Sequence, residues 1–201
     1  MYTPPAFKVD DPELIRQFVR ENSFGILISS VDGTSIQETH TPFLLTDDSR
    51  KLFGHIARAN GHWRDWEKNP RIKVIFHGPH CYVSPTFYKS VTNVPTWNYT
   101  AVSVTGKIEL VSDYDEQKTF MHTLVGANES AFPDPWFLDE SNDTLMKLFS
   151  AVVFFKIQIT KIEAKFKLNQ NKSKEDQQLV RKNLSVSESP FEQAVARLME
   201  D

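Results

Sequence analysis

A chain of 201 residues with 40% hydrophobic and 24% charged residues has the composition of a globular protein, which excludes a disordered or fibrous class. The formal net charge of −3 excludes a global positive field that would attract nucleic acid, although a local basic patch is compatible with it. The single cysteine, Cys81, excludes an internal disulfide and fits a reducing compartment. The first residues lack the basic and apolar regions of a signal peptide, and no apolar run approaches a bilayer span. We therefore expect a cytoplasmic protein.

The first half of the chain predicts one helix followed by strands. Asp11 is a suitable helix cap, and Pro12 suits the first helical position. The apolar run 24–30 predicts a strand. Asp32-Gly33 predicts a hairpin turn, because both central residues of that turn need positive φ. Further strands are expected over residues 35–45, 51–57 and 72–77.

Pro42 lies inside the strand expected over residues 35–45. Proline has no backbone N–H to donate to a neighbouring strand. We therefore expect the ladder to be broken, or to lie at a sheet edge, at this position.

The second half of the chain predicts two more strands and several helices. Apolar and polar residues alternate over 102–111 and again over 153–159, which is typical of half-buried strands. The residue types favour helix starts at Asp113, Asn142, Ser173 and Ser189.

Six or more strands in hairpin order, with helices at the margins, predict a mainly β fold: an antiparallel barrel with flanking helices. The last thirty residues differ in composition from the rest, and the chain shows no internal repeat. We expect the barrel domain to cover residues 1–171 and a helical tail to cover residues 172–201.

Metal binding and nucleophilic catalysis are not favoured. The six histidines lack an HExxH motif, paired cysteines or a carboxylate cluster, so hydrogen-bonded structural histidines are the simpler interpretation. Cys81 is adjacent to His80, and neighbouring residues of a strand point to opposite faces. A buried, inert thiol is therefore expected.

The stretch "GHIARANGHWRDW", residues 54–66, could bind a phosphate. A strand ends at Ala57 and a short helix follows, with Asn60 as a suitable N-cap and Gly61 allowing close approach to a ligand. The N–H groups at a helix start attract anions, and Arg58 adds donors suited to phosphate. A plain capped helix whose tryptophans fill the core fits the same residues equally well.

Two further stretches combine aromatic, polar and cationic residues. Trp97-Asn98-Tyr99 offers a flat ring and an amide to a planar ligand, although a tryptophan packed at a barrel end is common. "AKFKLNQNK", residues 164–172, places Lys165 and Lys167 on one strand face before a polar cluster; a solvated strand end is the alternative. Together with residues 54–66, they suggest an aromatic anionic ligand.

The chain resembles the PaiB-type FMN-binding negative transcriptional regulators, a family of the flavin-binding split-barrel superfamily that also contains the pyridoxamine phosphate oxidases. The stretches that carry the resemblance are "MYTPPAF", "THTPFLL", "GHIARANGHWRDW", "VIFHGPHCYVSPTFY", "VPTWNY" and "KFKLNQNK". They extend from residue 1 to about residue 180, and the last twenty residues show no match. The resemblance implies an antiparallel, Greek-key split β-barrel, a homodimer, and FMN at the subunit interface. We expect the helical tail to pack on the barrel or on the partner subunit.

The resemblance also implies cofactor contacts. The strand "THTPFLL" would lie along the flavin ring through His40, Thr41, Pro42 and Phe43. The stretch "GHIARAN" and its continuation would hold the ribityl phosphate through His55, Ile56, Arg58, Ala59, Asn60, His62 and Trp63. Segments of the partner subunit would contribute Trp97, Asn98, Lys167, Gln170 and Asn171. Asn169 replaces the family's usual serine, and Gly61 replaces its usual proline.

Three functions remain open from the sequence. The resemblance implies an FMN-binding regulator, but the net charge and the lack of a helix-turn-helix or basic stripe do not support direct DNA binding. A flavin-dependent oxidoreductase, such as a flavin reductase or a pyridoxamine phosphate oxidase-like enzyme, is the second hypothesis. A haem-binding split-barrel protein is the third.

Overall fold

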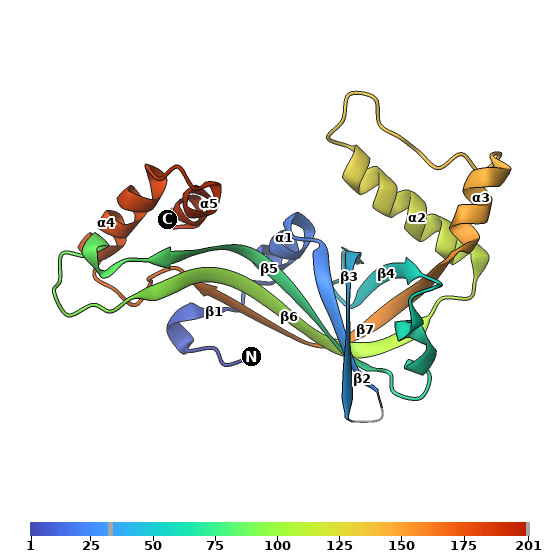
Figure 1. Ribbon diagram of the computed structural model, residues 1–201, viewed down its shortest axis with the longest axis horizontal. Coiled ribbons are helices and arrows are strands. Elements are labelled where there is room, and N and C mark those ends of the chain that lie inside the picture. The colour runs from blue at the N-terminus through green and yellow to red at the C-terminus, as the bar shows by residue number, and fades with distance from the viewer. Residues whose placement is uncertain (32–33, 200–201) are drawn as a thin grey trace. The chain divides into compact units, whose positions relative to one another are not determined.

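The computed structural model describes residues 1–31 and 34–199 (Figure 1). The turn expected at Asp32-Gly33 lies outside the described residues. The elements in chain order are η1 (Pro5–Phe7), β1 (Lys8–Val9), α1 (Pro12–Glu21), β2 (Phe24–Val31), β3 (Ser35–Leu45), β4 (Lys51–Ala57), η2 (Gly61–Asp65), β5 (Arg71–Val83), η3 (Pro85–Phe87), β6 (Thr96–Leu110), α2 (Tyr114–Glu129), α3 (Asp143–Ser150), β7 (Val152–Lys167), α4 (Lys174–Ser185) and α5 (Pro190–Leu198), where η marks 3₁₀ helices.

The strands form one seven-stranded sheet in the order β1-β7-β4-β3-β2-β5-β6, and an additional pairing of β6 with β7 closes it. β2, β3 and β4 follow one another in hairpin order, and β5 returns to pair with β2. A fourth strand that returns beside the first of three consecutive strands is a Greek key. The expected antiparallel barrel with flanking helices is therefore confirmed.

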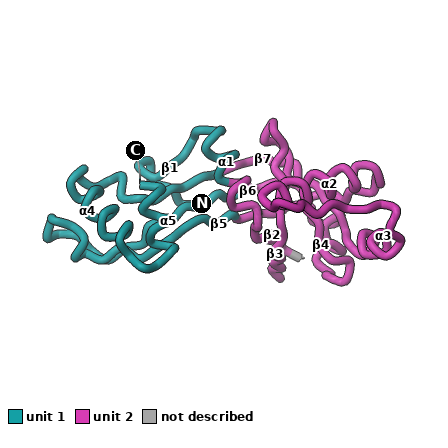
Figure 2. The backbone as a smooth tube through the Cα atoms, turned by 90° about the horizontal axis from the view of Figure 1, so that it is seen from above, with its two compact units in different colours: residues 1–18, 76–103, 163–201 teal, residues 19–75, 104–162 magenta. Residues whose placement is uncertain are grey.

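The chain divides into two compact units (Figure 2). Unit 1 contains residues 1–18, 76–103 and 163–201, and unit 2 contains residues 19–75 and 104–162. β5, β6 and β7 each contribute residues to both units. Unit 2 holds the strand pairings that close the barrel, and unit 1 holds β1, α4 and α5.

Three strands are longer than expected. β5, β6 and β7 extend to Val83, back to Thr96 and on to Lys167, whereas the sequence predicted 72–77, 102–111 and 153–159. In β5 the alternation of buried residues is interrupted at Pro79 and His80. An internal proline usually indicates the end of a strand, and for this reason the sequence did not predict the extension.

The helix starts agree with the sequence. The side chains of Asp113, Asn142, Ser173 and Ser189 each accept a hydrogen bond from a backbone N–H in the first turn of the following helix. Asp11 does the same for α1, accepting from the N–H groups of Glu13 and Leu14. Each cap satisfies a donor that has no partner within the helix.

The interior of unit 2 is aromatic and aliphatic. Trp66 is buried and packs edge-on against Phe155 with ring centroids 5.0 Å apart. Phe155 also meets Phe43 at 6.0 Å. Gly54 lies directly under Phe155, because a Cβ atom added there would fall within 2.4 Å of the ring.

On the outer face of unit 2, α2 and α3 cover the sheet. A second apolar cluster lies there, formed by Val111, Phe120, Leu124, Leu138, Phe149 and Phe154. Among the described residues, no helix is both long and apolar enough to cross a membrane.

Replacing Gly54 by alanine should lower the free energy of unfolding by roughly 1–3 kcal/mol, because the new methyl group must displace the buried Phe155 ring. Gly61→Ala is the matched control, since nothing lies within 4 Å of its added Cβ atom. Chemical denaturation of both variants measures the difference. Equal stability of the two would contradict the packing described for Phe155.

Candidate functional site

β3 and β4 form a ladder over only part of their length. Residues 43–45 pair with residues 52–54. Before Pro42, β3 pairs with β2, and β4 pairs with β7 along its whole length. In the part of the chain that the structure describes, the facing edges His40–Pro42 and His55–Ala57 therefore lack a ladder to each other. We call this gap the β3–β4 opening.

Pro42 and Thr41 explain how the ladder stops there. Pro42 has no N–H to donate, so the break expected in the strand is confirmed on the side of β4. The Thr41 hydroxyl donates a hydrogen bond of 2.5 Å to the carbonyl oxygen of His55. A side chain thus replaces part of the missing ladder and satisfies a backbone acceptor.

The side chains at the β3–β4 opening point in two directions. Those of Thr41, Phe43 and Ile56 are buried inside the barrel, whereas His40 is exposed and Pro42 is half-buried. Successive residues of a strand face opposite sides of the sheet. A ligand in the opening would therefore meet the backbone, but not the side chains, of the three buried residues.

His55 contributes an uncommitted polar atom. Its ring lies 6.1 Å from Phe120 and 6.0 Å from Phe154, measured between centroids. Its Nδ1 atom is buried without a hydrogen-bond partner among the described residues. Burial lowers the pKa of this imidazole, so it is neutral at pH 7. A neutral ring with an unsatisfied nitrogen is suited to hydrogen-bond a ligand.

Asn60 shapes the loop that follows β4. Its side-chain oxygen accepts a hydrogen bond of 3.1 Å from the His62 N–H, as expected for an N-cap. Its side-chain nitrogen donates to the Thr39 hydroxyl at 3.0 Å. The helix that it caps is a five-residue 3₁₀ helix, η2. Asn60 thereby joins the loop to β3.

His62 is a structural anchor of the same loop. The side chain is 2% exposed, and its two ring nitrogens lie 2.7 Å from the Ser29 hydroxyl and 2.9 Å from the Thr39 hydroxyl. Burial lowers the pKa of His62, although Glu38 and Asp65 act in the opposite direction. A neutral ring that bridges two hydroxyl groups has both nitrogens satisfied.

Arg58 and Trp63 fix the other side of the loop. The Arg58 guanidinium donates to the carbonyl oxygens of Ser150 and Val152, at 3.1 and 3.0 Å. The Trp63 indole donates to the Arg58 carbonyl at 3.1 Å. Two of the five guanidinium N–H groups are thus used within the protein. The side chain is exposed, as is Ala59, so the remaining N–H groups face solvent.

Eleven of the expected contact residues therefore belong to unit 2. They line the β3–β4 opening or form the loop beyond it: His40, Thr41, Pro42, Phe43, His55, Ile56, Arg58, Ala59, Asn60, His62 and Trp63. The other five belong to unit 1.

In unit 1, Trp97 and Asn98 lie on opposite faces of β6. Trp97 is 54% exposed, whereas Asn98 is fully buried. The Asn98 side-chain nitrogen lies 3.8 Å from the sulfur of Met199, just beyond α5, and its oxygen has no partner among the described residues. Trp97 is available to a ligand, and the Asn98 side chain is covered by the C-terminal helix.

Lys167 is the centre of a lysine cluster in unit 1. Its Nζ atom donates to the Thr96 hydroxyl and to the Trp97 carbonyl. Burial, with the nearby charges of Lys165 and Lys172, lowers the pKa of Lys167. Lys165, Lys167 and Lys172 hydrogen-bond neutral oxygens only, in the described residues. Three ammonium groups without a carboxylate favour an anion at this position.

The turn after Lys167 is held by Asn169 and Gln170. Asn169 has a φ of 67°, a left-handed conformation that asparagine adopts more readily than most residues. It accepts a hydrogen bond from the Tyr88 hydroxyl, and its Nδ2 atom is buried without a described partner. The Gln170 amide is used on the backbone of Phe166 and Leu168. Asn171 is exposed.

This chemistry fits FMN. The backbone edges of the β3–β4 opening and the free nitrogen of His55 offer hydrogen bonds to a heteroaromatic ring. The lysine cluster and the outer N–H groups of Arg58 offer positive charge for a phosphate or for a reduced flavin. Within the described residues, no three histidine, cysteine or carboxylate side chains gather as a metal site would require.

Comparison with known proteins shows which family the chain belongs to. The model of the family described as "Putative FMN-binding domain" matches residues 1–161. The chain belongs to this FMN-binding family. FMN is accordingly its cofactor. The matched range includes the whole β3–β4 opening and its loop, and it ends before Lys167.

A curated relative extends the similarity to the full chain. The "Protease synthase and sporulation protein PAI 2" of Bacillus subtilis (strain 168) is 37% identical over 204 residues, which cover 100% of this chain and 97% of the relative. The chain is therefore a PaiB-like flavin-binding protein, as the sequence resemblance implied. This similarity includes α4 and α5, which the family model does not cover.

Solved structures support the fold. The FAD and heme binding protein of Mycobacterium smegmatis has a TM-score of 0.62 at 12% identity, covering 84% of this chain and 78% of that one. The flavocytochrome Anf3 of Azotobacter vinelandii has a TM-score of 0.61 at 15% identity, covering 85% and 74%. At such identities the likeness concerns the fold alone. The expected split β-barrel is confirmed.

Several residues that position the site were not expected. Ser29 and Thr39 hold His62, and Phe120 packs on His55, yet each is an ordinary strand or helix residue in sequence. Only the pairing of β2 with β3 and the position of α2 bring them there. Lys172 had a visible signal, since it ends the cationic stretch that begins at Lys165.

Stability should fall as the pH drops below about 6.5, the usual pKa of histidine. His55 and His62 have lowered pKa values in the folded protein, so the unfolded chain takes up their protons first. Each histidine can add up to about 1.4 kcal/mol per pH unit to the fall in the free energy of unfolding, until the pH reaches its pKa in the folded protein. Urea denaturation between pH 7.5 and pH 5 measures how the free energy of unfolding depends on pH. His62→Gln should make this dependence shallower. An unchanged slope in that variant would contradict the buried neutral state of His62.

Proposed function

We propose that this protein is a homodimeric FMN-dependent regulator in which the flavin lies at the β3–β4 opening. The observation that carries the proposal is the missing ladder between His40–Pro42 and His55–Ala57, which leaves two strand edges without a ladder to each other inside the family's FMN-binding domain. The loop from Arg58 to Trp63 then holds the phosphate. FMN supplies a two-electron redox centre whose state a regulator can sense.

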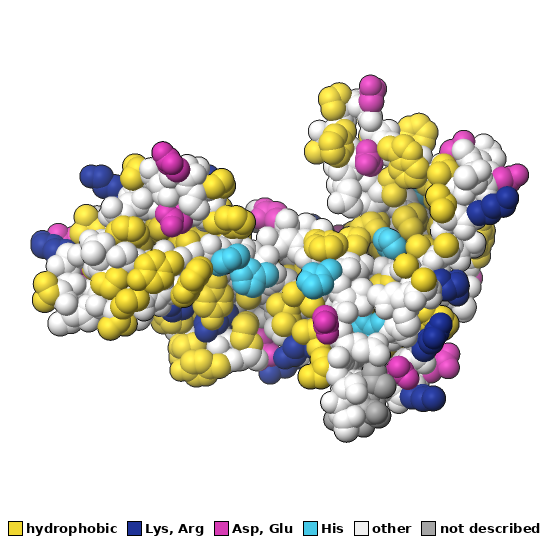
Figure 3. Space-filling model, viewed as in Figure 1, with side chains coloured by type: hydrophobic (Ala, Val, Ile, Leu, Met, Phe, Trp, Pro, Cys, Tyr) yellow, Lys and Arg dark blue, Asp and Glu magenta, His cyan; other side chains and the backbone are white. Residues whose placement is uncertain are grey.

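A second copy of the chain completes the site in this proposal. Its Trp97, Lys167, Gln170 and Asn171 contact the flavin, with Asn98 supporting the strand from beneath. Exposed aromatic side chains support an interface on unit 1, because large exposed apolar groups mark contact surfaces. Tyr82 is 43% exposed and meets Trp97 edge-on at 6.1 Å. Figure 3 shows hydrophobic side chains gathered over β5 and β6 beside histidine side chains.

The regulatory role rests on the resemblance to the PaiB-type regulators, and the relative of Bacillus subtilis is named "Protease synthase and sporulation protein PAI 2". The net charge of −3 argues against direct DNA binding, so the regulation proposed is indirect. A gel-shift assay at physiological salt tests this point. A sharp, sequence-specific shift by the purified protein would contradict the indirect role.

The absorption spectrum of the purified protein tests the proposal as a whole. The two visible bands of oxidised flavin, with one FMN per chain and a dimer mass by light scattering, are the expected result. A monomer that binds FMN would contradict the proposal that two subunits share the site, but FMN would still be the cofactor. Rapid reduction of the bound FMN by NADH or NADPH would instead favour an oxidoreductase, for which no described residue is an evident proton donor.

Arg58→Ala should weaken FMN binding by about 1.5–3 kcal/mol, the range for a lost charged hydrogen bond. The Arg58 side chain also holds two carbonyl oxygens of the protein, so a smaller loss of stability should accompany it. Titration of FMN by fluorescence quenching measures the affinity.

Arg64→Ala is the control, because Arg64 is exposed on η2 and stacks over Trp63 at 5.9 Å. An Arg58 variant with unchanged affinity but reduced stability would place the phosphate elsewhere and leave Arg58 a purely structural residue.

Haem binding is a second candidate that one contact favours. The Nδ1 atoms of His77 and His80 lie 2.9 and 3.3 Å from the same carbonyl oxygen, that of Gly78. A carbonyl only accepts, so each Nδ1 carries a proton, which leaves Nε2 of each ring as the nitrogen that could bind iron. A Soret band on haem titration that His80→Ala abolishes would support this function. Saturation with FMN and no Soret band would exclude it.

A further inference from the structure

A pocket lies on the outer face of unit 2, where α2 packs against β4. It has a volume of about 430 Å³ and is lined by Leu44, Thr46, Phe53, Glu116, Thr119, Phe120 and Thr123. We call it the α2 pocket. Its volume falls in the range of small-molecule sites, about 300–1,000 Å³. None of its lining residues is an expected cofactor contact.

The side of the pocket formed by the sheet is apolar. Leu44 of β3 pairs with Phe53 of β4, and residues that lie directly opposite each other in a ladder project from the same face. The Phe53 ring stacks on the Phe120 ring of α2, with centroids 5.7 Å apart and planes 24° apart. Leu44 and Phe53 are only half-buried. Part of this apolar surface is therefore still open to a ligand.

The side formed by α2 carries short side chains where larger ones would cover the sheet. Glu116, Thr119, Phe120 and Thr123 lie at the i, i+3, i+4 and i+7 positions of one helix face. Both threonines are exposed. Threonine is less favourable in a helix than leucine, lysine or glutamate. Neither helix propensity nor burial explains these two residues, and both leave the pocket open.

The polar groups of the pocket favour an uncharged ligand. Of the described lining residues, Glu116 alone is charged, and its two carboxylate oxygens accept hydrogen bonds from the Lys156 ammonium group at 3.1 and 3.2 Å. A charged ligand would lose hydration here without a free counter-ion. The Thr123 hydroxyl donates to the Thr119 carbonyl at 2.8 Å. The Thr119 hydroxyl forms no hydrogen bond within residues 1–31 and 34–199, so it can bond to a ligand.

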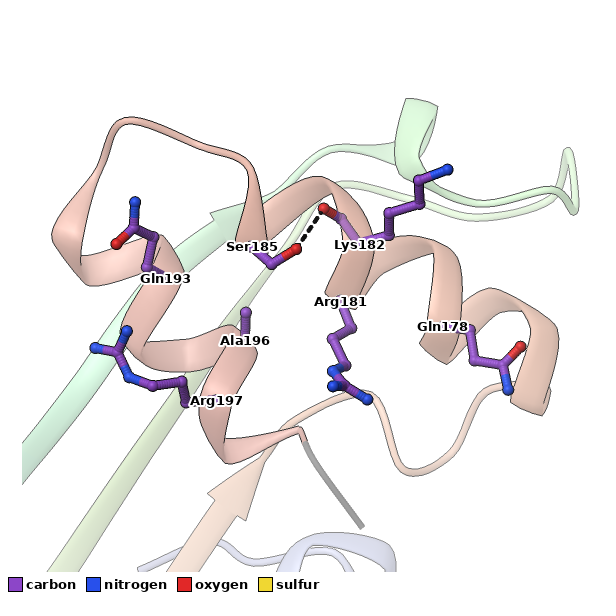
Figure 4. Close-up of a pocket in the computed structure, with 7 residues that line it drawn as sticks. All are labelled: Gln178, Arg181, Lys182, Ser185, Gln193, Ala196 and Arg197. Atoms are coloured by element: carbon purple, nitrogen blue, oxygen red, sulfur yellow. Dashed lines mark hydrogen bonds between the residues drawn. The ribbon is translucent and has the colours of Figure 1, made fainter.

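The groove between α4 and α5 in unit 1 has the opposite character (Figure 4). Among the described residues that line it, Ala196 alone is apolar, and the others are polar or cationic. It offers no ring on which an aromatic ligand could pack. An aromatic ligand should therefore prefer the α2 pocket to this groove.

The α2 pocket is next to the β3–β4 opening. Pro42 and Leu44 project from one face of β3, and Phe53 and His55 project from one face of β4, because alternate residues of a strand share a face. The Phe120 ring lies 5.7 Å from Phe53 and 6.1 Å from His55, measured between centroids. One aromatic ring thus contacts both the pocket and the uncommitted histidine of the opening.

We propose that the α2 pocket binds a small, uncharged aromatic molecule. The rings of this molecule pack on Leu44, Phe53 and Phe120, and one of its polar groups forms a hydrogen bond with the Thr119 hydroxyl. Its place beside the flavin rests on the proposed function. The pocket itself does not, because its residues are not expected cofactor contacts.

Isothermal titration of the full-length FMN-loaded protein with 1-naphthol tests the proposal. This probe is uncharged at pH 7 and carries one hydroxyl group on two fused rings. Saturable binding is expected. The anionic analogue 1-naphthoate and the cationic analogue 1-naphthylmethylammonium should each bind at least about tenfold more weakly, because the pocket offers no free counter-ion. A charged analogue that binds as tightly as 1-naphthol would overturn the proposal.

Thr119→Phe and Thr123→Phe, made separately, each place a phenyl group at the pocket and should weaken 1-naphthol binding at least about tenfold. Both positions are exposed, so the variants should fold, and circular dichroism reports whether they do. The control is Thr144→Phe, the same change at an exposed position of α3 that does not line the pocket. Its affinity should match that of the unmodified protein.

Three results would overturn the proposal. The first is no saturable binding of 1-naphthol, and the second is an equal loss of affinity in the control. The third is binding that appears only when the protein is diluted to a monomer, because a second copy of the chain would then occupy the pocket. Failure of the proposed function is distinguishable, since a protein that binds 1-naphthol but no FMN would contradict that function alone.

Discussion

The constraint on which the site depends is the missing N–H of Pro42. Without that donor, β3 cannot continue its ladder with β4, and the two strands separate after the pairing of Phe43 with Gly54. The Thr41 hydroxyl then satisfies the carbonyl oxygen of His55, which would otherwise be left without its partner. The barrel can therefore stay open at this point without a buried, unsatisfied backbone acceptor, and this is where we propose that the flavin binds.

The loop beyond the opening is held by hydrogen bonds on two sides. His62 and Asn60 converge on the hydroxyl of Thr39, so that β3 holds the loop from beneath. Arg58 ties its other side to the carbonyl oxygens at the end of α3 and the start of β7. Most of the polar atoms in this network already have partners in the protein. In the proposed site, the groups of unit 2 that remain for the cofactor are the backbone edges, Nδ1 of His55 and the outer N–H groups of Arg58.

Much of the fold could be predicted from sequence, because local chemistry determines it. The bounds of β3 and β4 and the caps of the four later helices follow from alternation and from capping residues, and they were found as expected. The extension of β5 beyond His77 could not be predicted, since a proline such as Pro79 usually indicates the end of a strand. The sequence and the family resemblance located the candidate site, but they did not separate its roles. Asn98 and His62 were both predicted to contact the cofactor, but the Asn98 side chain is covered by α5, and His62 is buried with both ring nitrogens held by Ser29 and Thr39.

Hydrogen exchange with and without FMN tests the central claim most directly, because the claim concerns backbone groups. The account predicts that bound FMN slows exchange in the peptides containing His40–Pro42 and His55–Ala57, which pair with β2 and β7 but not with each other. Stoichiometric FMN binding that leaves both segments unchanged, and slows exchange in another part of the chain, would contradict it.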